Sequence, residues 1–483
     1  MNNPENTKPL SRTKIVATLG PASEDRATIR EMAQQGMDAA RLNLSHGSRE
    51  QHSGFIENIR SISSSLSTPL SIIADTKGPE IRVSPLGEEL YLEKNDHVDI
   101  IVDPAGKPEN NRNILIADSE IFLESVSEED ILLIGDGEIE LQTLSVGETK
   151  VSCRVLNSGT VTDRKGLNIR GVDIPLPTIT DQDKKDIRFA VRQGVDWLAI
   201  SFVRNPEDIN IARKLVKEEN ETEEEILVIA KIETIKALEN IEAIVQEADG
   251  IMVARGDLGM ATDLEEVPFL QKQIIKLANR YAKPVITATQ MLESMIRLPS
   301  PTRAEVTDVA NAVLDGTDAL MLSAETAAGS YPVRTIATMY RISEKAETHN
   351  LGLKMGGEEM KTIEGIAPAI GRAACSTAER LNAKAIITST RSGYTARLIS
   401  RFRPNVRIVA VTPSRKVYQQ LALLWGVNPL LIEVIDNTDE MVDRSIETAR
   451  NGGYINDGDL VVITAGVPFA VRGTTNLIKV ERA

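Results

Sequence analysis

Residues that could do chemistry follow several short apolar runs of this sequence. The clearest are Lys231 and Glu233, which stand two residues apart at the end of the run 226–233. Because side chains alternate along a strand, both would project to the same side. Asp257 ends another run, after Gly256, which lets a ligand approach the backbone. Two carboxylates beside a lysine suit a Mg²⁺ or Mn²⁺ ion that holds a phosphate or carboxylate substrate, although a structural ion pair would use the same residue types.

A second group of strand-end residues offers only oxygen atoms. It consists of Asn43, Ser45, Asp75 and Thr76. One carboxylate with amide, hydroxyl and carbonyl oxygens would suit a monovalent cation better than a divalent one. A network of hydrogen bonds at the strand ends is the alternative interpretation. The sequence alone leaves both open.

Three basic residues are candidates for contacts with phosphate groups. Arg41 lies at the end of one apolar run, Arg82 opens the region that follows another, and Lys165 lies in a turn 83 residues after Arg82. Each could also be an ordinary solvated surface cation. Thr289 and Ser323 end two further runs and supply hydroxyl groups.

The elements that must position these residues form a regular alternation of apolar runs and amphipathic helical segments. A continuous apolar run is typical of a parallel strand that is buried on both faces. Eight strand-then-helix units predict an α/β fold, a (β/α)8 TIM barrel whose active site lies at the carboxyl ends of the strands. The eight runs span residues 13–20, 39–46, 70–78, 197–203, 226–233, 250–257, 284–291 and 319–326.

Two regions depart from this alternation and indicate further domains. Residues 79–171 have turn-rich, period-two patterns, which predict an inserted small all-β barrel that acts as a lid. Residues 347–483 resume an α/β pattern and predict an open C-terminal α/β domain. The catalytic barrel would then comprise residues 13–78 and 172–346, after a flexible N-terminal segment, residues 1–12.

Composition narrows the class of protein. The chain has 483 residues, a net charge of −15 and two cysteines. An acidic chain is a poor partner for nucleic acid, whose phosphates need basic surface. Two isolated cysteines favour a reducing compartment, and no run is long and apolar enough to span a membrane or to form a secretory signal. We therefore expect a cytoplasmic enzyme.

A hydroxyl-rich loop in the C-terminal domain is a candidate anion site. It precedes a predicted helix, where free backbone N–H groups favour phosphate. Ordinary helix capping by Ser or Thr would explain the same composition. The loop contains Ser389, Thr390, Arg391, Ser392, Gly393 and Thr395.

Over essentially its full length the sequence resembles pyruvate kinase. The resemblance rests on motifs that occur in one order at the predicted strand ends. They span residues 18–23 (TLGPAS), 41–47 (RLNLSHG), 75–82 (DTKGPEIR), 231–233 (KIE), 254–259 (ARGDLG), 288–295 (ATQMLESM) and 323–326 (SAET).

The resemblance implies a phosphoryl transfer from phosphoenolpyruvate to ADP, which gives pyruvate and ATP as the last step of glycolysis. It implies catalytic roles for Lys231, Arg41 and Thr289. Substrate contacts would come from Arg41, Lys231, Gly256, Asp257 and Thr289, and nucleotide contacts from Asn43, Leu44, Ser45, His46, Arg82 and Lys165. Glu233 and Asp257 would bind Mg²⁺ (or Mn²⁺). Asn43, Ser45, Asp75 and Thr76 would bind K⁺, on which the enzyme is expected to depend because Glu80 is present.

Regulation and assembly are also implied by the resemblance. The loop 389–395 corresponds to the family's allosteric phosphate loop, so we expect activation by a sugar phosphate or nucleotide, with residues 465–475 closing over the effector. A homotetramer is expected. The donor of the proton to the enolate is not identified, and a water chain near Thr289 and Ser323 is our interpretation. An aldolase or lyase with a Schiff-base lysine, and a catalytically silent metabolite sensor, are the competing hypotheses.

Overall fold

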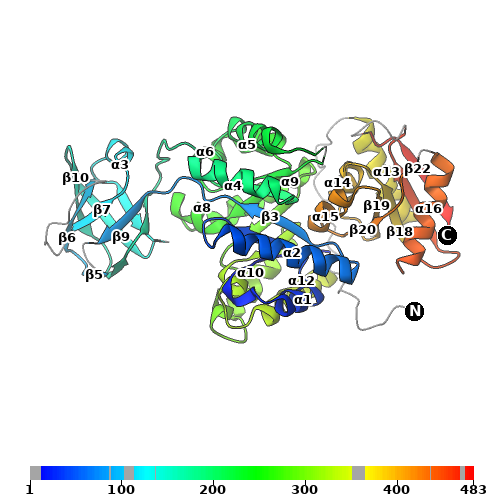
Figure 1. Ribbon diagram of the computed structural model, residues 1–483, viewed down its shortest axis with the longest axis horizontal. Coiled ribbons are helices and arrows are strands. Elements are labelled where there is room, and N and C mark those ends of the chain that lie inside the picture. The colour runs from blue at the N-terminus through cyan, green and yellow to red at the C-terminus, as the bar shows by residue number, and fades with distance from the viewer. Residues whose placement is uncertain are drawn as a thin grey trace.

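The computed structural model places three folded parts in a row, with the barrel in the middle, the lid at one end and the C-terminal domain at the other (Figure 1). Residues 1–11, most of the predicted N-terminal segment, lie outside the described residues. The structure describes residues 12–85, 89–102, 114–135, 137–222, 224–350, 365–435, 437–467 and 474–483.

The central part is a closed barrel of eight parallel strands, which confirms the predicted TIM barrel. The strands follow the order β1-β17-β16-β15-β14-β13-β3-β2 around the barrel. They are β1 (Lys14–Thr18), β2 (Ala39–Asn43), β3 (Ser71–Asp75), β13 (Trp197–Ile200), β14 (Leu227–Ile232), β15 (Gly250–Ala254), β16 (Val285–Ala288) and β17 (Ala319–Leu322). The main helices around them are α1 (Arg26–Gln34), α2 (Arg49–Leu66), α4 (Asp181–Arg192), α5 (Pro206–Glu219), α7 (Ile241–Glu247), α9 (Val267–Arg280), α10 (Arg303–Leu314) and α12 (Pro332–Asn350).

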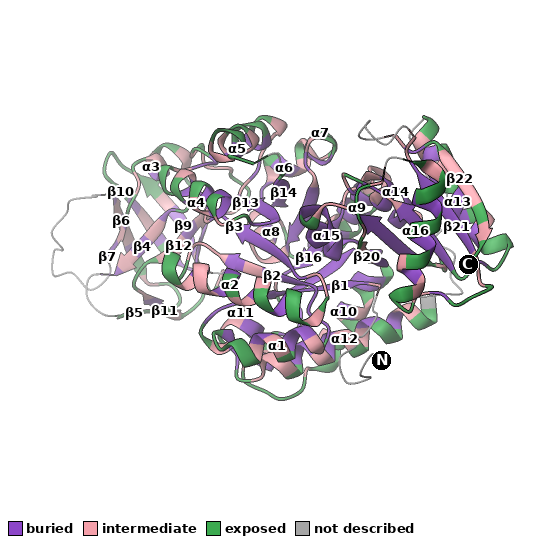
Figure 2. Ribbon diagram, turned by 45° about the vertical axis from the view of Figure 1, so that its right-hand side comes forward, coloured by how far each residue is buried: buried purple, intermediate pink, exposed green. Residues whose placement is uncertain are grey.

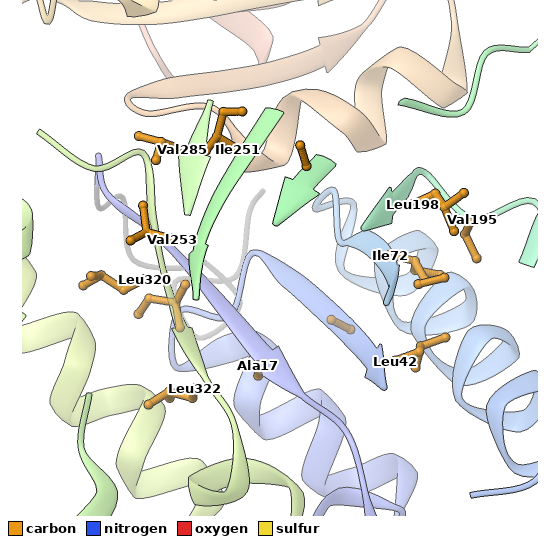
Figure 3. Close-up of a cluster of buried hydrophobic side chains, with 14 of the residues drawn as sticks. Ala17, Leu42, Ile72, Val195, Leu198, Ile251, Val253, Val285, Leu320 and Leu322 are labelled. Atoms are coloured by element: carbon orange, nitrogen blue, oxygen red, sulfur yellow. The ribbon is translucent and has the colours of Figure 1, made fainter. Parts of the chain in front are cut away.

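Successive side chains of each barrel strand point alternately to the outside and to the inside of the barrel, so the core has two layers. One set of strand side chains, including Leu42 and Leu320, faces the surrounding helices (Figure 3). The other set, including Ile73, Ile229 and Met252, fills the inside of the barrel. Because strand side chains repeat with a period of two, the next inward positions at the carboxyl ends are polar. They include Thr18, Arg41, Asp75, Ser201, Lys231 and Ser323.

Side-chain caps fix where the outer helices begin. Asp25 accepts a hydrogen bond from Thr28 N before α1, and Ser48 accepts one from Gln51 N before α2. Thr180 and Thr302 form capping boxes before α4 and α10. Each cap satisfies backbone N–H groups that have no partner within the helix, and each contributes about 1 kcal/mol.

The lid is a closed seven-stranded β-barrel, in agreement with the predicted all-β insertion. Its strands are β4 (Arg82–Pro85), β6 (His97–Val102), β7 (Ile114–Ala117), β8 (Ile131–Ile134), β9 (Ile139–Val146), β10 (Lys150–Val155) and β12 (Lys165–Ile169). Two more strands, β5 (Glu89–Leu92) and β11 (Gly159–Thr162), pair separately, and the short α3 (Ile121–Ser125) follows β7.

Gly78 lies where the chain leaves β3 for the lid. Its φ is +73°, and a Cβ built there would lie 2.6 Å from Cδ2 of Phe202 and 2.8 Å from Cβ of Ser201. Any other residue would therefore clash and would also strain the backbone.

The C-terminal domain is a five-stranded sheet with helices on both faces, as predicted for an open α/β domain. Its order is β20-β19-β18-β21-β22, and β22 is the one antiparallel strand. The edge strand β20 was not predicted, because Pro429 weakens its strand pattern. The elements are α13 (Ile366–Arg380), β18 (Ala385–Ser389), α14 (Tyr394–Ser400), β19 (Arg407–Thr412), α15 (Arg415–Gln420), η4 (Leu421–Leu423), β20 (Val427–Leu431), α16 (Thr438–Asn451), β21 (Leu460–Ala465) and β22 (Leu477–Arg482).

The C-terminal domain closes the amino end of the barrel. Leu423 of η4 belongs to the same buried cluster as the inward side chains of the barrel strands. Arg403 forms an ion pair with Asp318 at 2.9 Å, just before β17. The purple, buried segments in Figure 2 run through the barrel and into this junction. No helix within the described ranges has the length and apolar character needed to cross a membrane.

Candidate active site

A cleft of about 490 Å³ lies between the carboxyl ends of the barrel strands and the lid. The barrel contributes Arg41, Asn43, Ser45, His46, Thr76, Ser201, Lys231, Glu233 and Asp257 to its wall, and the lid contributes Arg82, Arg164 and Lys165. The structure therefore brings most of the predicted site residues to one place. The wall does not include four of the predicted active-site residues that the structure describes, Leu44, Asp75, Gly256 and Thr289.

Lys231 lies at the floor of the cleft among acidic and hydroxyl oxygens. Its Nζ is 3.0 Å from Oε1 of Glu233 and 3.2 Å from Oδ1 of Asp75, and it donates a hydrogen bond to Oγ of Ser201 at 2.6 Å. Burial alone would lower the pKa of Lys231, but Asp75, Glu233 and Asp257 outweigh it and raise the pKa above its ordinary value. Lys231 is therefore a permanent cation at neutral pH.

Asp75 links this lysine to Arg41. Nε of Arg41 donates to Oδ2 of Asp75 at 2.6 Å, and Nη1 of Arg41 donates to Oγ1 of Thr18 at 3.2 Å. Asp75 is fully buried, which would raise its pKa, yet Lys231 and Arg41 reverse this effect and lower it. The ionised Asp75 thus fixes two cations that face the cleft.

Glu233 and Asp257 reach the cleft from different local structures. Oε2 of Glu233 accepts a hydrogen bond from Phe202 N at 2.6 Å. Phe202 has a φ of +53°, so the backbone at the end of β13 is turned toward this carboxylate. The strand predicted through Asp257 ends at Ala254, and Asp257 lies in the first turn of α8 (Arg255–Ala261). Hard carboxylate oxygens of this kind suit Mg²⁺, which usually binds one or two carboxylates and completes its shell with water and substrate.

Among the described residues, no group of three or more His, Cys, Asp and Glu side chains is arranged to coordinate a metal ion. The donor set of Glu233 and Asp257 nevertheless fits a divalent ion that shares its coordination with substrate. The three carboxylates Asp75, Glu233 and Asp257 face two cations, Lys231 and Arg41, so an added cation would improve the local charge balance.

Thr289 lies at the end of β16 in a strained turn. Thr289 and Gln290 have φ values of +69° and +54°. Oγ1 of Thr289 accepts a hydrogen bond from Gly256 N at 2.8 Å, which joins this turn to the start of α8. The two predicted substrate contacts Gly256 and Thr289 are therefore in direct contact with each other.

Arg255 holds this turn in place, although no role was predicted for it. Its Nη2 donates to the backbone oxygen of Thr289 at 2.6 Å, and its Nη1 forms an ion pair with Asp308 of α10 at 2.8 Å. A charged residue at a strand end was a signal for Arg255. Asp308 gave no such signal, because it lies on a helix about fifty residues away in the sequence and only the fold brings it near.

The predicted K⁺ ligands lie on neighbouring strand ends. Asn43 and Asp75 are register partners of β2 and β3. Oδ1 of Asn43 accepts from Ser45 N at 3.2 Å, and the backbone oxygen of Thr76 accepts from Oγ of Ser201 at 2.8 Å. Asn43, Ser45 and Thr76 line the cleft, whereas the side chain of Asp75 is directed to Lys231 and Arg41.

The basic residues of the lid face the cleft in pairs with acids. Arg82 contacts Oε2 of Glu80 at 2.6 Å, and Lys77 lies 3.7 Å from the same carboxylate. Nζ of Lys165 lies 2.9 Å from Oε2 of Glu138. These pairs are partly exposed, so they contribute little to stability and can exchange partners when a phosphate arrives.

The predicted effector loop surrounds a hollow of about 50 Å³ in the C-terminal domain. Gly393 has a φ of +77° and caps α14, and Oγ1 of Thr395 lies 2.9 Å from Oγ1 of Thr475. Residues 468–473 of the segment expected to cover this loop lie outside the described residues. Ser389, Thr390, Arg391, Ser392 and Thr395 line the hollow, together with Gly466 and Thr474.

Comparison with known proteins identifies the family. The family model described as "Pyruvate kinase, barrel domain" matches residues 10–336, and "Pyruvate kinase, alpha/beta domain" matches residues 368–481. Pyruvate kinases of Staphylococcus epidermidis and Staphylococcus aureus are 44% and 43% identical over 98% of this chain and 80% of theirs. A crystal structure of a pyruvate kinase from Cryptosporidium parvum superimposes with a TM-score of 0.89 at 36% identity, covering 98% of this chain and 96% of that one.

These matches extend over the barrel, the inserted lid and the C-terminal domain. They agree with a cleft in which a buried lysine, two carboxylates and lid cations converge. The chain therefore belongs to the pyruvate kinase family, the phosphotransferases that convert phosphoenolpyruvate and ADP into pyruvate and ATP.

Proposed function

We propose that Lys231 is the residue that stabilises the phosphoryl group as it passes from phosphoenolpyruvate to ADP. The observation that carries this assignment is the placement of its charged Nζ at the cleft floor, held between Asp75, Glu233 and Ser201. Phosphoryl transfer needs mainly positioning and neutralisation of charge on the equatorial oxygens. Arg41, fixed by Asp75, supplies a second cation for the same group.

The remaining contacts divide between substrate and nucleotide. Gly256, Asp257 and Thr289 would bind phosphoenolpyruvate, with Thr289 held by Arg255. Asn43, Leu44, Ser45 and His46 would bind the nucleotide from the barrel side, and Arg82 and Lys165 from the lid. Closure of the lid would bring these cations over the phosphates and exclude water from the transfer. Ser323, whose buried Oγ has no hydrogen-bond partner in the described chain, supports a water near Thr289 as the proton donor.

Two cations complete the proposed site. Glu233 and Asp257 would hold Mg²⁺ (or Mn²⁺), and Asn43, Ser45, Asp75 and Thr76 would hold K⁺. The chemistry that a bound divalent ion supplies is neutralisation of charge on the phosphoryl oxygens and on the enolate oxygen of pyruvate.

A coupled assay tests this function. Purified protein is supplied with phosphoenolpyruvate and ADP, and pyruvate is followed in the presence and absence of Mg²⁺ and K⁺. We expect turnover that needs Mg²⁺ and that falls when Na⁺ replaces K⁺. Full activity in Na⁺ would refute the proposed K⁺ site, and activity after chelation of divalent ions would refute the metal assignment.

We also propose a homotetramer that a sugar phosphate or nucleotide activates at the loop 389–395. The apolar residues Leu264, Phe269 and Leu298 are more than half exposed, which supports an interface that covers them. Sedimentation velocity tests the assembly. Titration of sugar phosphates and AMP at low phosphoenolpyruvate tests the effector, and no response to any of them would refute it.

A cytoplasmic location completes the proposal. The two cysteines, Cys153 and Cys375, are buried and unpaired. Burial raises the pKa of each thiol to about 12. Unreactive free thiols of this kind are typical of proteins from a reducing compartment.

A further inference from the structure

An uncompensated guanidinium lies at the junction between the barrel and the C-terminal domain. Arg401 follows α14, and only 4% of its surface is exposed. Within the described part of the chain, its Nε, Nη1 and Nη2 atoms are all buried without a hydrogen-bond acceptor. The ring of Phe402, 5.1 Å from its Cζ, is the contact that the structure gives for the charge. A cation–π contact offsets only a small part of the free-energy cost of burying an unpaired ion.

Arg401 cannot escape this cost by losing its proton, because the guanidinium keeps its charge in proteins. Its surroundings add further positive charge, since Arg372 and Arg280 both act to lower its pKa. Burial lowers that pKa more than either neighbour, and the tyrosine Tyr394 opposes them only in part. A buried charge in this position requires a counter-charge.

A small cavity beside Arg401 has room for a counter-ion. It measures about 10 Å³, close to the space that a single water-sized species needs. Two more cations, Lys283 and Arg397, line it. Lys283 donates to the backbone oxygens of Gln246 and Ala248 and so stays in place.

The one carboxylate in the cavity wall, Asp318, is already committed to other partners. Its two oxygens contact Arg403 at 2.9 and 3.0 Å, and they also accept hydrogen bonds from Val285 N and Trp425 N. Asp318 therefore balances Arg403 and leaves the charge of Arg401 to something else. Water in the cavity would supply an acceptor but no negative charge.

We infer that this cavity binds one small monatomic anion, chloride or another halide, in contact with the guanidinium of Arg401. The anion would join α14 to the turn before β16, where Lys283 and Pro284 lie. The residues that line this cavity include none of the loop 389–395, so the two sites are separate.

A crystal of the full-length protein grown in sodium bromide tests the inference directly. We expect an anomalous-scattering peak in the cavity, in contact with Arg401. A water molecule there, or a protein carboxylate from any copy of the chain against the guanidinium, would overturn the proposal.

Solution stability gives an independent test. The melting temperature of the full-length protein is compared in sodium chloride and in sodium gluconate of equal ionic strength, because gluconate is too large for the cavity. We expect a melting temperature on the order of 2 °C higher in chloride. The difference should disappear in Arg401→Gln and persist in Arg444→Gln, which removes an exposed arginine of α16. Equal melting temperatures of the native protein in the two salts, or an unchanged difference in Arg401→Gln, would contradict the site.

Discussion

Nζ of Lys231 lies 3.0 Å from Oε1 of Glu233, and the two side chains are 10% and 1% exposed. A buried lysine and glutamate two residues apart at the end of β14 could have been a structural ion pair. The surroundings favour a working site, because Lys231 also contacts Asp75 and Ser201 and faces the cleft that the lid covers. The raised pKa of Lys231 means that its charge persists throughout the neutral range and is lost only as the pH rises through that raised value.

Glu233→Gln should separate metal binding from folding. The amide can still accept the hydrogen bond from Phe202 N but carries no charge for a divalent ion. We expect turnover to fall by about 10²-fold or more, with weaker Mn²⁺ binding measured by electron paramagnetic resonance. Glu239→Gln, at an exposed ion pair with Lys236, serves as the control and should bind Mn²⁺ normally. Native Mn²⁺ affinity in Glu233→Gln would refute its assignment as a metal ligand.

Asp75→Asn should destabilise the protein and change its response to acid. The substitution leaves Lys231 and Arg41 without their buried counter-charge, which we expect to cost about 3 kcal/mol at pH 7. Because the folded-state pKa of Asp75 is lowered, its contribution is complete above about pH 4, the ordinary range of Asp, and is lost as the pH falls through the lowered value. Urea unfolding of both proteins from neutral to acidic pH measures this. If the difference in free energy of unfolding between the native protein and Asp75→Asn stayed constant below pH 4, the assigned ionisation of Asp75 would be contradicted.

Arg255→Lys should act through the position of Thr289. Lysine cannot reproduce the hydrogen bonds that Arg255 makes to the backbone of Thr289 together with its ion pair to Asp308. We expect kcat to fall by about 10-fold or more and KM for phosphoenolpyruvate to rise, while KM for ADP changes little. Arg303→Lys, on the exposed face of α10, is the matched control. Unchanged kcat and KM values in Arg255→Lys would show that the turn at Thr289 does not depend on the contacts of Arg255.

Lys165→Ala should weaken nucleotide binding with little effect on stability. The pair between Lys165 and Glu138 is partly exposed, so its loss should cost under about 1 kcal/mol. We expect KM for ADP to rise by about 10-fold and KM for phosphoenolpyruvate to stay near its native value. Lys150→Ala removes a comparable lid pair with Asp99 and should leave both constants unchanged. An equal effect of the two substitutions would argue against a nucleotide contact at Lys165.

Sequence patterns predicted the fold to a large extent because the barrel is built from local units. Continuous apolar runs such as residues 226–233 indicate a buried strand without any partner being known. Short lid strands such as Lys165–Ile169 and the edge strand Val427–Leu431 were missed, because a glycine or proline within four or five residues hides the pattern.

Some residues of the candidate site could be predicted from the sequence, and others could not. Lys231, Glu233 and Asp75 could be identified because a charged residue at the end of an apolar run is costly unless it has a use. Contacts between distant segments could not be predicted. Nothing in the sequence near Arg255 indicates its partner Asp308. Nothing near Arg401 indicates the cavity that it lines together with Lys283. The start of α8 at Arg255 was also missed, because the apolar pattern of β15 continues into residues that the fold turns into a helix.

The central claim is that Lys231 stabilises the transferring phosphoryl group. The most direct test is the rate of pyruvate formation by Lys231→Met, measured at saturating phosphoenolpyruvate, ADP, Mg²⁺ and K⁺. Methionine keeps the length of the side chain but not its charge, so we predict a fall in kcat of at least about 10³-fold, with binding of Mn²⁺ and phosphoenolpyruvate largely retained. A kcat within a few-fold of the native value in a folded Lys231→Met protein would contradict the account.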